Sequence, residues 1–447
     1  MSSSRRTSPK VREAVTMSYE FLNLAEGRWA RVFGYRSSRR RPARSASSPS
    51  CACRPRAGSQ VKVVRLANYV APASGGLRTA LRELGAGYLA VGHEPVLVIP
   101  GPRPGSRYTE QGLVITVSGP VVPGTGGYRA ITARRSLRRL LDRLEPDRLE
   151  VSDRTTLRWT GAWARARGVR SMMVSHDSLA GLMRMFRLPG VPDQRLADRL
   201  NRATAASYDV VVCTTKWAAA EFRRLRVPNL AQVPLGVDLA FFHPGRRDED
   251  LRSRLAPSGV PLLVHCSRLS PEKRSERAVG ALAELRRRGV PAVLVVAGDG
   301  PRRRSLEAQA AGLPVRFLRH VADRALLARL LATADVVIAP GPVETFGLSA
   351  LEALASGTPV VVSNRSALPE VVGPAGLAAE DSDAACADAV EQLLGRHAAE
   401  RRRRARQQAE RFDWPTAVNG FLAAHGLSVP GPPAAEPEPV MQPAGRP

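Results

Sequence analysis

The chain has 447 residues, which is enough for two domains with full hydrophobic cores. Its formal charge is +27, but aromatic residues make up only 5% and no RRM, KH, zinc-finger or helix-turn-helix signature occurs, so we expect an anionic membrane surface rather than nucleic acid as partner. No apolar run reaches the ~18 residues that span a bilayer, and the five cysteines show neither a disulfide framework nor a zinc-ligand pattern.

Residues 1–60 differ from the rest of the chain in composition. They are rich in Ser, Arg and Pro, and their only acidic residues are Glu13, Glu20 and Glu26. Two interpretations stay open. The segment is a disordered basic tail, or the annotated start is too early, since Val61 opens the first regular strand and valine can be encoded by the bacterial start codon GUG.

An alternation of strands and helices begins at residue 61. An apolar strand at 61–68 leads through Gly75 and Gly76 into a helix at 77–91. Glycine lets the backbone approach a ligand closely, and a helix N-terminus attracts anions, so this turn is a candidate phosphate-binding loop. Further strands are predicted at residues 95–99, 113–117, 148–151, 170–174 and 209–213.

Polar residues follow two of these strands. Asp153 comes after the strand at 148–151, and His176 comes after the strand at 170–174. Because ligands of parallel α/β sheets bind beyond the carboxyl ends of the strands, we expect both side chains to point toward a cleft.

Two segments of the first half are candidates for contact with lipid. A helix at 130–144 carries arginines at 134, 135, 138, 139 and 143, and residues 182–188 combine five apolar residues with two arginines. Apolar side chains can enter the head-group boundary while arginines meet lipid phosphates. A solvated helix face and a segment of the protein's own core are the respective alternatives.

A second α/β domain begins with a strand at 261–265. The run 266–274 holds Arg268 and Lys273 and opens the first helix of this domain. Two cations beside a strand end can form charge-assisted hydrogen bonds with an anion. Residues 248–250 (Asp-Glu-Asp) match a metal-binding D-x-D pattern by letters, but they lie in a polar segment and we interpret them as solvated.

The stretch 335–361 has the pattern strand, loop, helix, strand. Its helix is predicted to start near Phe346 and Gly347, with Glu344 in the preceding loop and Glu352 inside the helix. The helix start favours phosphate, and a carboxylate can accept two hydrogen bonds from a ribose diol. This combination indicates a nucleotide-sugar site, and two solvated glutamates on an ordinary helix are the alternative.

Asp323 precedes a predicted helix at 324–332. Its carboxylate could accept the adjacent N1–H and N2–H donors of guanine, whereas uracil offers one N–H between two carbonyls. A helix cap is the alternative role.

At residues 339–361 the chain resembles the GT4 family of retaining glycosyltransferases, which have the GT-B fold. The Glu344-x7-Glu352 signature, the Phe346-Gly347-Leu348 turn and the Ala-Ser-Gly-Thr-Pro-Val tail are present, and the resemblance covers about residues 61–425. It implies an α/β protein with two Rossmann-like domains that face a central cleft. The implied parts are an acceptor-binding domain at 61–235, a nucleotide-sugar-binding domain at 236–410 and a helix at 411–426 that crosses back to the first domain.

Residues 427–447, after the implied crossover helix, are rich in Pro and Ala. Such a composition cannot bury enough apolar surface to fold. We expect this tail to be disordered.

The resemblance also implies roles for single residues. The expected catalytic residues are His176 beside the transferred sugar, Arg268 and Lys273 on the leaving diphosphate, and Glu344 on the sugar hydroxyls. The expected donor-binding residues are Gly75, Gly76, Arg268, Lys273, Asp323, Glu344, Phe346, Gly347, Leu348 and Glu352. The expected acceptor-binding residues are Tyr128, Arg129 and Asp153. No metal ion and no other cofactor is expected to be required.

Shorter runs resemble the phosphatidylinositol mannosyltransferases of actinobacteria, closest to the PimC type; they lie at residues 74–80, 125–130, 149–154, 211–215 and 340–348. This implies transfer of mannose from GDP-mannose to a phosphatidylinositol mannoside with retained α configuration, by a cytoplasmic enzyme peripheral to the inner face of the plasma membrane. Another nucleotide sugar, a soluble acceptor, a sugar-nucleotide epimerase and a non-catalytic binding protein stay open. So does the choice between front-face attack and a covalent intermediate, and no carboxylate nucleophile is assigned.

Overall fold

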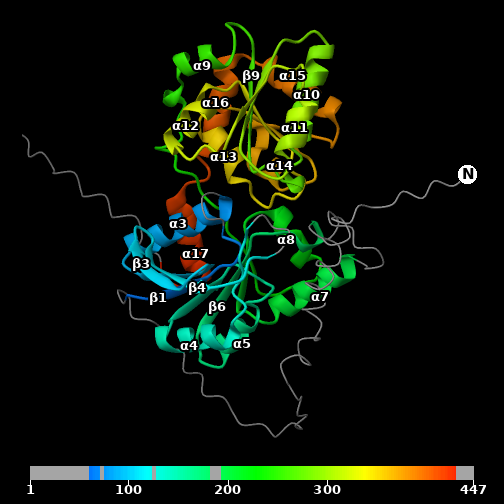
Figure 1. The fold of residues 1–447 in the computed structure, drawn as a ribbon. Helices are drawn as coiled ribbons and strands as arrows, with labels where there is room; N and C mark the ends of the chain where they lie inside the picture. Colours follow the sequence, from blue (N-terminus) through cyan, green and yellow to red (C-terminus); the bar gives the residue numbers. More distant parts are fainter. Residues whose placement is uncertain (1–59, 71–74, 123–126, 182–192, 429–447) are drawn as a thin grey trace, which may run out of the picture.

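The computed structural model describes residues 60–70, 75–122, 127–181 and 193–428. They form two α/β domains, which lie one above the other in Figure 1. The tails predicted at 1–60 and 427–447 lie outside the described residues, apart from residues 60, 427 and 428, and so does the lipid-contact segment predicted at 182–188.

The first domain is built on an eight-stranded sheet with the order β3-β4-β2-β1-β5-β6-β7-β8. All neighbouring strands are parallel except β3 and β4. The strands are β1 Lys62–Leu66, β2 Glu94–Gly101, β3 Gly105–Thr109, β4 Gly112–Ser118, β5 Arg148–Val151, β6 Arg170–Ser175, β7 Val210–Cys213 and β8 Leu230–Gln232. The helices are α3 Gly76–Ala90, α4 Arg134–Leu144, α5 Trp159–Arg165, α7 Asp193–Ala205 and α8 Lys216–Arg223.

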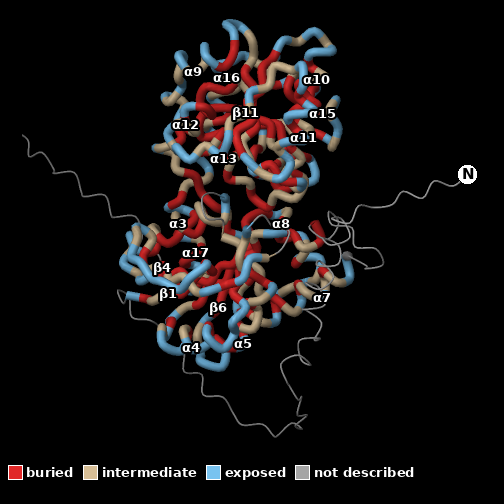
Figure 2. Tube along the Cα trace, in the orientation of Figure 1, coloured by how far each residue is buried: buried red, intermediate tan, exposed pale blue. Residues whose placement is uncertain are grey.

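The second domain is built on a six-stranded parallel sheet with the order β11-β10-β9-β12-β13-β14. The strands are β9 Leu262–Cys266, β10 Val293–Ala297, β11 Val315–Leu318, β12 Val336–Ala339, β13 Val360–Ser363 and β14 Leu377–Ala379. The helices are α9 Glu249–Leu255, α10 Glu276–Arg287, α11 Arg303–Gln309, α12 Arg324–Thr333, α13 Leu348–Ala355, α14 Leu368–Val372, α15 Asp383–Leu394 and α16 Ala398–Ala409. The central strands β9, β10, β12 and β13 are mostly buried (red in Figure 2), because helices cover both faces of the sheet, whereas the edge strands β11 and β14 are only partly buried.

Several elements differ from the sequence prediction, and three of the differences have a local cause. Strand β3 was not predicted, because its side chains are mostly exposed and lack an apolar pattern. Helix α4 begins at Arg134, four residues later than predicted. The run 266–274 forms a loop with a short 3-10 turn instead of opening a helix, because Arg274 adopts a left-handed conformation (φ 51°) that interrupts the chain before α10.

Two chain segments cross between the domains side by side. The Val237 N–H donates to the Phe412 carbonyl at 2.9 Å. Gly236 has no room for a side chain, since a Cβ there would lie 2.5 Å from the backbone nitrogen at the start of α17 (Trp414–Ala424). Helix α17 then packs against α3 of the first domain (Figure 1), which confirms the predicted crossover helix.

A buried polar cluster holds the end of this crossover. The Arg65 Nε donates to the Glu150 carboxylate at 3.0 Å, the Tyr88 hydroxyl donates to it at 2.9 Å, and the His425 Nε2 lies 3.4 Å from it. Burial alone would raise the pKa of Glu150, but Arg65 and His425 lower it to about 2. The ionised carboxylate therefore links β1, α3 and the segment after α17.

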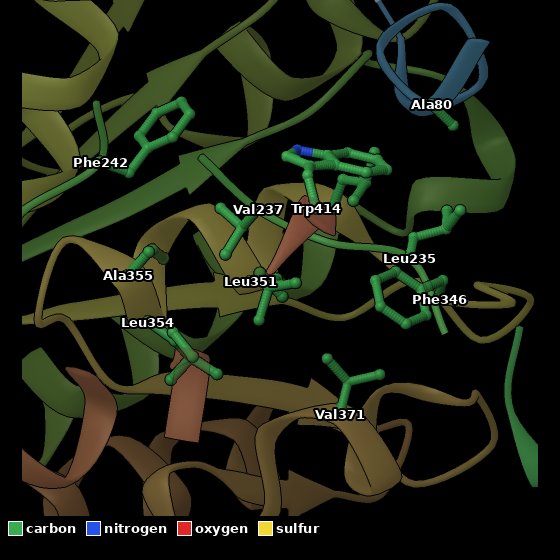
Figure 3. Close-up of a cluster of buried hydrophobic side chains, with 14 of the residues drawn as sticks. Ala80, Leu235, Val237, Phe242, Phe346, Leu351, Leu354, Ala355, Val371 and Trp414 are labelled. Atoms are coloured by element: carbon green, nitrogen blue, oxygen red, sulfur yellow. The ribbon is translucent and has the colours of Figure 1, made fainter. Parts of the chain in front are cut away.

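One hydrophobic cluster continues from the second domain into these crossing segments. Figure 3 shows Leu235 and Val237 of the linker together with Phe346, Leu351 and Trp414. The Phe346 ring also meets the Phe412 ring edge-on at 5.9 Å between centroids. This packing fixes the loop that precedes α13 against the connection between the domains.

Candidate active site

The first component of the site is the turn between β12 and α13. Gly347 has φ 81°, and a Cβ at this position would lie 2.1 Å from the Leu368 Cδ2, so only glycine fits. Helix α13 begins at Leu348, and no described side chain caps its N-terminus. The Ala350 and Leu351 N–H groups donate to the Gly347 carbonyl, so the amides of Leu348 and Ser349 are the ones available to an anion.

Lys273 is the cation beside this turn. The Lys273 ammonium forms an ion pair with the Glu344 carboxylate, and both side chains line a pocket together with Gly341, Gly347 and Ser267. The ion pair is about one quarter exposed on each side. An incoming diphosphate can therefore reach the ammonium without unfolding any element.

Arg268 is the second cation. Its guanidinium donates to the Glu272 carboxylate at 2.7 Å, contacts the Tyr128 hydroxyl and lies 4.9 Å from the centre of the Tyr128 ring. Tyr128 belongs to the first domain. The predicted diphosphate clamp and a predicted acceptor residue therefore meet across the cleft.

His176 follows β6 in the wall of the first domain. Its Nε2 lies 3.1 Å from the Ser152 hydroxyl, and the Thr345 hydroxyl donates to its backbone carbonyl at 2.6 Å. The side chain is half-buried, and this burial lowers the pKa of His176 to about 4. The imidazole is therefore neutral at pH 7, and it lies beside the loop that carries Glu344.

Glu352 lies one turn inside α13 and is partly buried. Burial raises its pKa to about 7, although Arg324 and Arg82 oppose the shift. Arg82 belongs to α3 of the first domain, so Glu352 faces the seam between the domains. Within the described ranges no hydrogen bond reaches its carboxylate, which is free to accept one from a ligand.

The other predicted residues take varied positions. Asp323 caps α12, because its Oδ1 accepts from the Ala325 N–H at 2.8 Å. Its role toward guanine stays a prediction. Gly75 and Gly76 are exposed, and a Cβ on Gly76 would lie 3.8 Å from the Leu348 Cδ1. The glycine loop thus faces the start of α13.

The remaining acceptor predictions concern Arg129 and Asp153. The Arg129 guanidinium donates to the Gly119 carbonyl at 2.6 Å. The Asp153 carboxylate is buried, and it accepts from the Asn68 amide at 3.2 Å and the Leu157 N–H at 3.0 Å. Both side chains fix loops of the first domain, and their roles toward an acceptor stay predictions.

Sequence reasoning missed two residues that shape the site. Ser152 binds the His176 ring, and Thr345 binds the His176 backbone. Each adjoins a predicted site residue in the sequence, but nothing in the spacing shows that its hydroxyl reaches across to another loop.

Two further observations concern metals and membranes. Within the described ranges no group of three His, Cys, Asp or Glu side chains could hold a metal ion, and no helix is long and apolar enough to cross a membrane. Asp248, from the run 248–250, caps α9 through the Leu251 N–H at 2.8 Å and pairs with Arg329 at 3.0 Å.

Comparison with protein families assigns both domains. Residues 246–412 match the model described as "Glycosyl transferases group 1", and residues 75–236 match the model described as "Glycosyl transferase 4-like domain". Among solved structures, sucrose-phosphate synthase from Thermosynechococcus elongatus superposes with a TM-score of 0.68 at 19% identity, covering 82% of this chain and 98% of that one. HepE of Anabaena, in complex with UDP and glucose, gives 0.65 at 18% identity, covering 82% and 100%. These likenesses establish the fold.

Curated relatives are closer in sequence. The "GDP-mannose-dependent alpha-(1-6)-phosphatidylinositol dimannoside mannosyltransferase" of Mycobacterium tuberculosis is 48% identical over 368 residues, covering 82% of this chain and 96% of the relative. The "GDP-mannose-dependent alpha-mannosyltransferase" of Mycolicibacterium smegmatis is 30% identical over 343 residues, covering 74% and 88%. These matches show that the chain is an enzyme of the GT4 family of GT-B glycosyltransferases.

Proposed function

We propose that this enzyme transfers mannose from GDP-mannose to a phosphatidylinositol mannoside with retention of the α configuration. The observation that carries the proposal is the 48% identity with a phosphatidylinositol dimannoside mannosyltransferase over nearly its whole length. The geometry supports the proposal, since Lys273, Glu344 and Gly347 line one pocket and Arg268 contacts Tyr128 of the first domain.

The second domain would assist the departure of the leaving group. As the bond between the sugar C1 and the phosphate oxygen breaks, negative charge grows on the diphosphate. Arg268, Lys273 and the first-turn amides of α13 would stabilise this charge, and such fixed donors are the largest single contribution in many enzymes. Binding of the diphosphate would draw Lys273 from Glu344, which frees that carboxylate for the sugar hydroxyls.

The acceptor hydroxyl would attack C1 from the face that the diphosphate leaves. A bond forms between the acceptor oxygen and C1, and the proton passes to the departing phosphate oxygen. His176 is neutral because of its lowered pKa. It could therefore form a hydrogen bond with the sugar without placing a positive charge beside it. The two cations and the helix start hold the diphosphate, and we propose that no metal ion is required.

We also propose that an anionic membrane surface is a partner. The arginines of α4 are exposed on the surface of the first domain, and each can contribute about 1 kcal/mol near an anionic leaflet. Figure 1 places α4 at the end of this domain that is remote from the second domain. Contact through α4 would therefore hold the enzyme at the membrane, while other elements guide the lipid head group into the cleft.

Radiolabelled transfer tests the proposed function. The purified enzyme is incubated with GDP-mannose labelled in the sugar and with a lipid extract that contains phosphatidylinositol mannosides. We expect label to enter the lipid phase with GDP-mannose and not with UDP-glucose. Label that stays in the aqueous phase, or moves to a water-soluble acceptor, would overturn the proposal.

A further inference from the structure

Thr345 is joined to the first domain by hydrogen bonds in both directions. Its hydroxyl donates to the His176 carbonyl at 2.6 Å, and its own carbonyl accepts from the Thr214 hydroxyl at 3.2 Å and the Thr215 hydroxyl at 2.9 Å. Thr345 is 9% exposed, Thr214 2% and Thr215 1%. The two bonds to the Thr345 carbonyl are buried and the bond from its hydroxyl is partly buried, and exclusion of water strengthens such bonds.

The partners of Thr345 are themselves held firmly. Thr215 is the N-cap of α8 and accepts from the Ala218 N–H at 3.0 Å, so its hydroxyl has a fixed position. The ring of His176 is held by Ser152 at 3.1 Å. Thr345 thus contacts two rigid points, at the carboxyl ends of β6 and β7.

The neighbours of Thr345 in sequence are the donor-site residues. Glu344 precedes it, and Phe346 and Gly347 follow it at the start of α13. Moving Thr345 relative to His176 therefore moves the predicted sugar carboxylate and the phosphate-binding turn relative to the histidine. The contact connects the two halves of the site through one residue.

A second contact lies on the same seam but outside the site. The Glu370 carboxylate of α14 accepts from the Lys216 N–H at 3.0 Å and the Trp217 N–H at 3.2 Å. These are the first amides of α8, and Figure 1 shows α8 and α14 facing each other across the seam. The linker and the crossover segment also join the two domains.

We infer that Thr345 is a positioning residue, which holds the donor-binding loop in register with His176 when the cleft is closed. The inference rests on the proposed transfer reaction for its kinetic consequence. Transfer requires the acceptor oxygen, C1 and the phosphate oxygen to be aligned, and a misplacement of about 1 Å can cost ~100-fold in rate. Most of the predicted donor-binding residues, such as Lys273, Asp323 and Glu352, belong to the second domain, so we expect nucleotide binding to depend on this register less than transfer does.

The test uses the full chain with three substitutions. Thr345→Val removes the hydroxyl at nearly constant volume, and Thr345→Ser keeps it. Thr358→Val is the matched control, because Thr358 is also fully buried in the second domain and its hydroxyl donates to the Leu331 carbonyl at 2.6 Å, away from the seam. GDP affinity is measured by calorimetry, and kcat by mannose transfer to lipid.

We expect Thr345→Val to lower kcat by about tenfold or more, with GDP affinity within about twofold of the parent. Thr345→Ser should restore most of kcat, and Thr358→Val should lower the melting temperature without this loss. Equal kcat for Thr345→Val and the parent would overturn the inference, and so would an equal loss in Thr358→Val.

A measurement that does not depend on turnover separates the inference about Thr345 from the proposed function. Small-angle scattering of the ligand-free proteins compares their radii of gyration. We expect a larger radius for Thr345→Val than for Thr345→Ser or the parent, because the closed arrangement loses its contact. If the parent fails to transfer mannose, the proposed function fails, and the scattering comparison still decides on Thr345: equal radii would overturn the inference.

Discussion

Replacing Glu352 with Gln should weaken nucleotide binding without unfolding the protein. The carboxylate is partly buried in α13, faces the seam and receives no hydrogen bond from the described residues. A hydrogen bond to a charged group contributes ~1.5–3 kcal/mol, and each ~1.4 kcal/mol is tenfold in affinity. We therefore expect GDP to bind roughly ten- to hundredfold more weakly to Glu352→Gln.

The raised pKa of Glu352 adds a pH dependence. In the free enzyme the carboxyl titrates near pH 7 because burial disfavours its charge. Ribose hydroxyls donate to the ionised form, so GDP affinity should rise between pH 6 and pH 8, as the group loses its proton. The GDP affinity of Glu352→Gln should not show this rise. Protonation of the nucleotide changes the affinity of both proteins equally, so subtracting one pH profile from the other leaves the effect of Glu352.

Isothermal titration calorimetry with GDP measures both effects. Glu391→Gln is the control, since Glu391 of α15 pairs with Arg288 at the end of α10 and lies outside the site. Circular dichroism checks that each variant is folded. Unchanged GDP affinity in folded Glu352→Gln at pH 8 would refute a role of Glu352 on the ribose.

Three other predictions concern separate parts of the molecule. His176→Ala should lower kcat by at least ~100-fold while GDP affinity stays within about twofold, and near-normal turnover would return His176 to a structural role. Asp323→Asn keeps a helix cap but loses the charge, so titrations should show a smaller preference for GDP over UDP; an unchanged preference would leave Asp323 as a cap alone. Replacing Arg135 and Arg139 of α4 with Ser should reduce co-sedimentation with phosphatidylinositol vesicles, since each arginine contributes about 1 kcal/mol, and equal sedimentation would exclude α4 as a membrane contact.

The parts of the fold that could be predicted are those that depend on residues close together in the sequence. The apolar run before Ala339 and the Gly347 turn belong to one strand and one helix, so periodicity and glycine placement locate β12 and α13 within a few residues. Strand β3 escaped prediction because it is an exposed edge strand, which has no apolar face to reveal it. The break in the chain before α10 was missed because the left-handed conformation of Arg274 cannot be predicted from its side chain.

The parts of the site that could not be predicted from the sequence are contacts between residues far apart in the chain. The spacing of Glu344 and Glu352 is local, and family motifs place it directly. The contact of Arg268 with Tyr128 joins positions 140 residues apart, and that of Thr345 with His176 joins positions 169 residues apart. Such pairs depend on how two domains close on each other, which no single stretch of sequence encodes.

Mass spectrometry of one purified lipid tests the central claim most directly. Phosphatidylinositol dimannoside is incubated with GDP-mannose and the enzyme, and its mass is measured before and after. We predict a gain of one hexose that depends on both GDP-mannose and active enzyme, and loss of the gain in Lys273→Ala. An unchanged lipid mass, in the presence of enzyme that binds GDP, would contradict the assignment of this lipid as the acceptor.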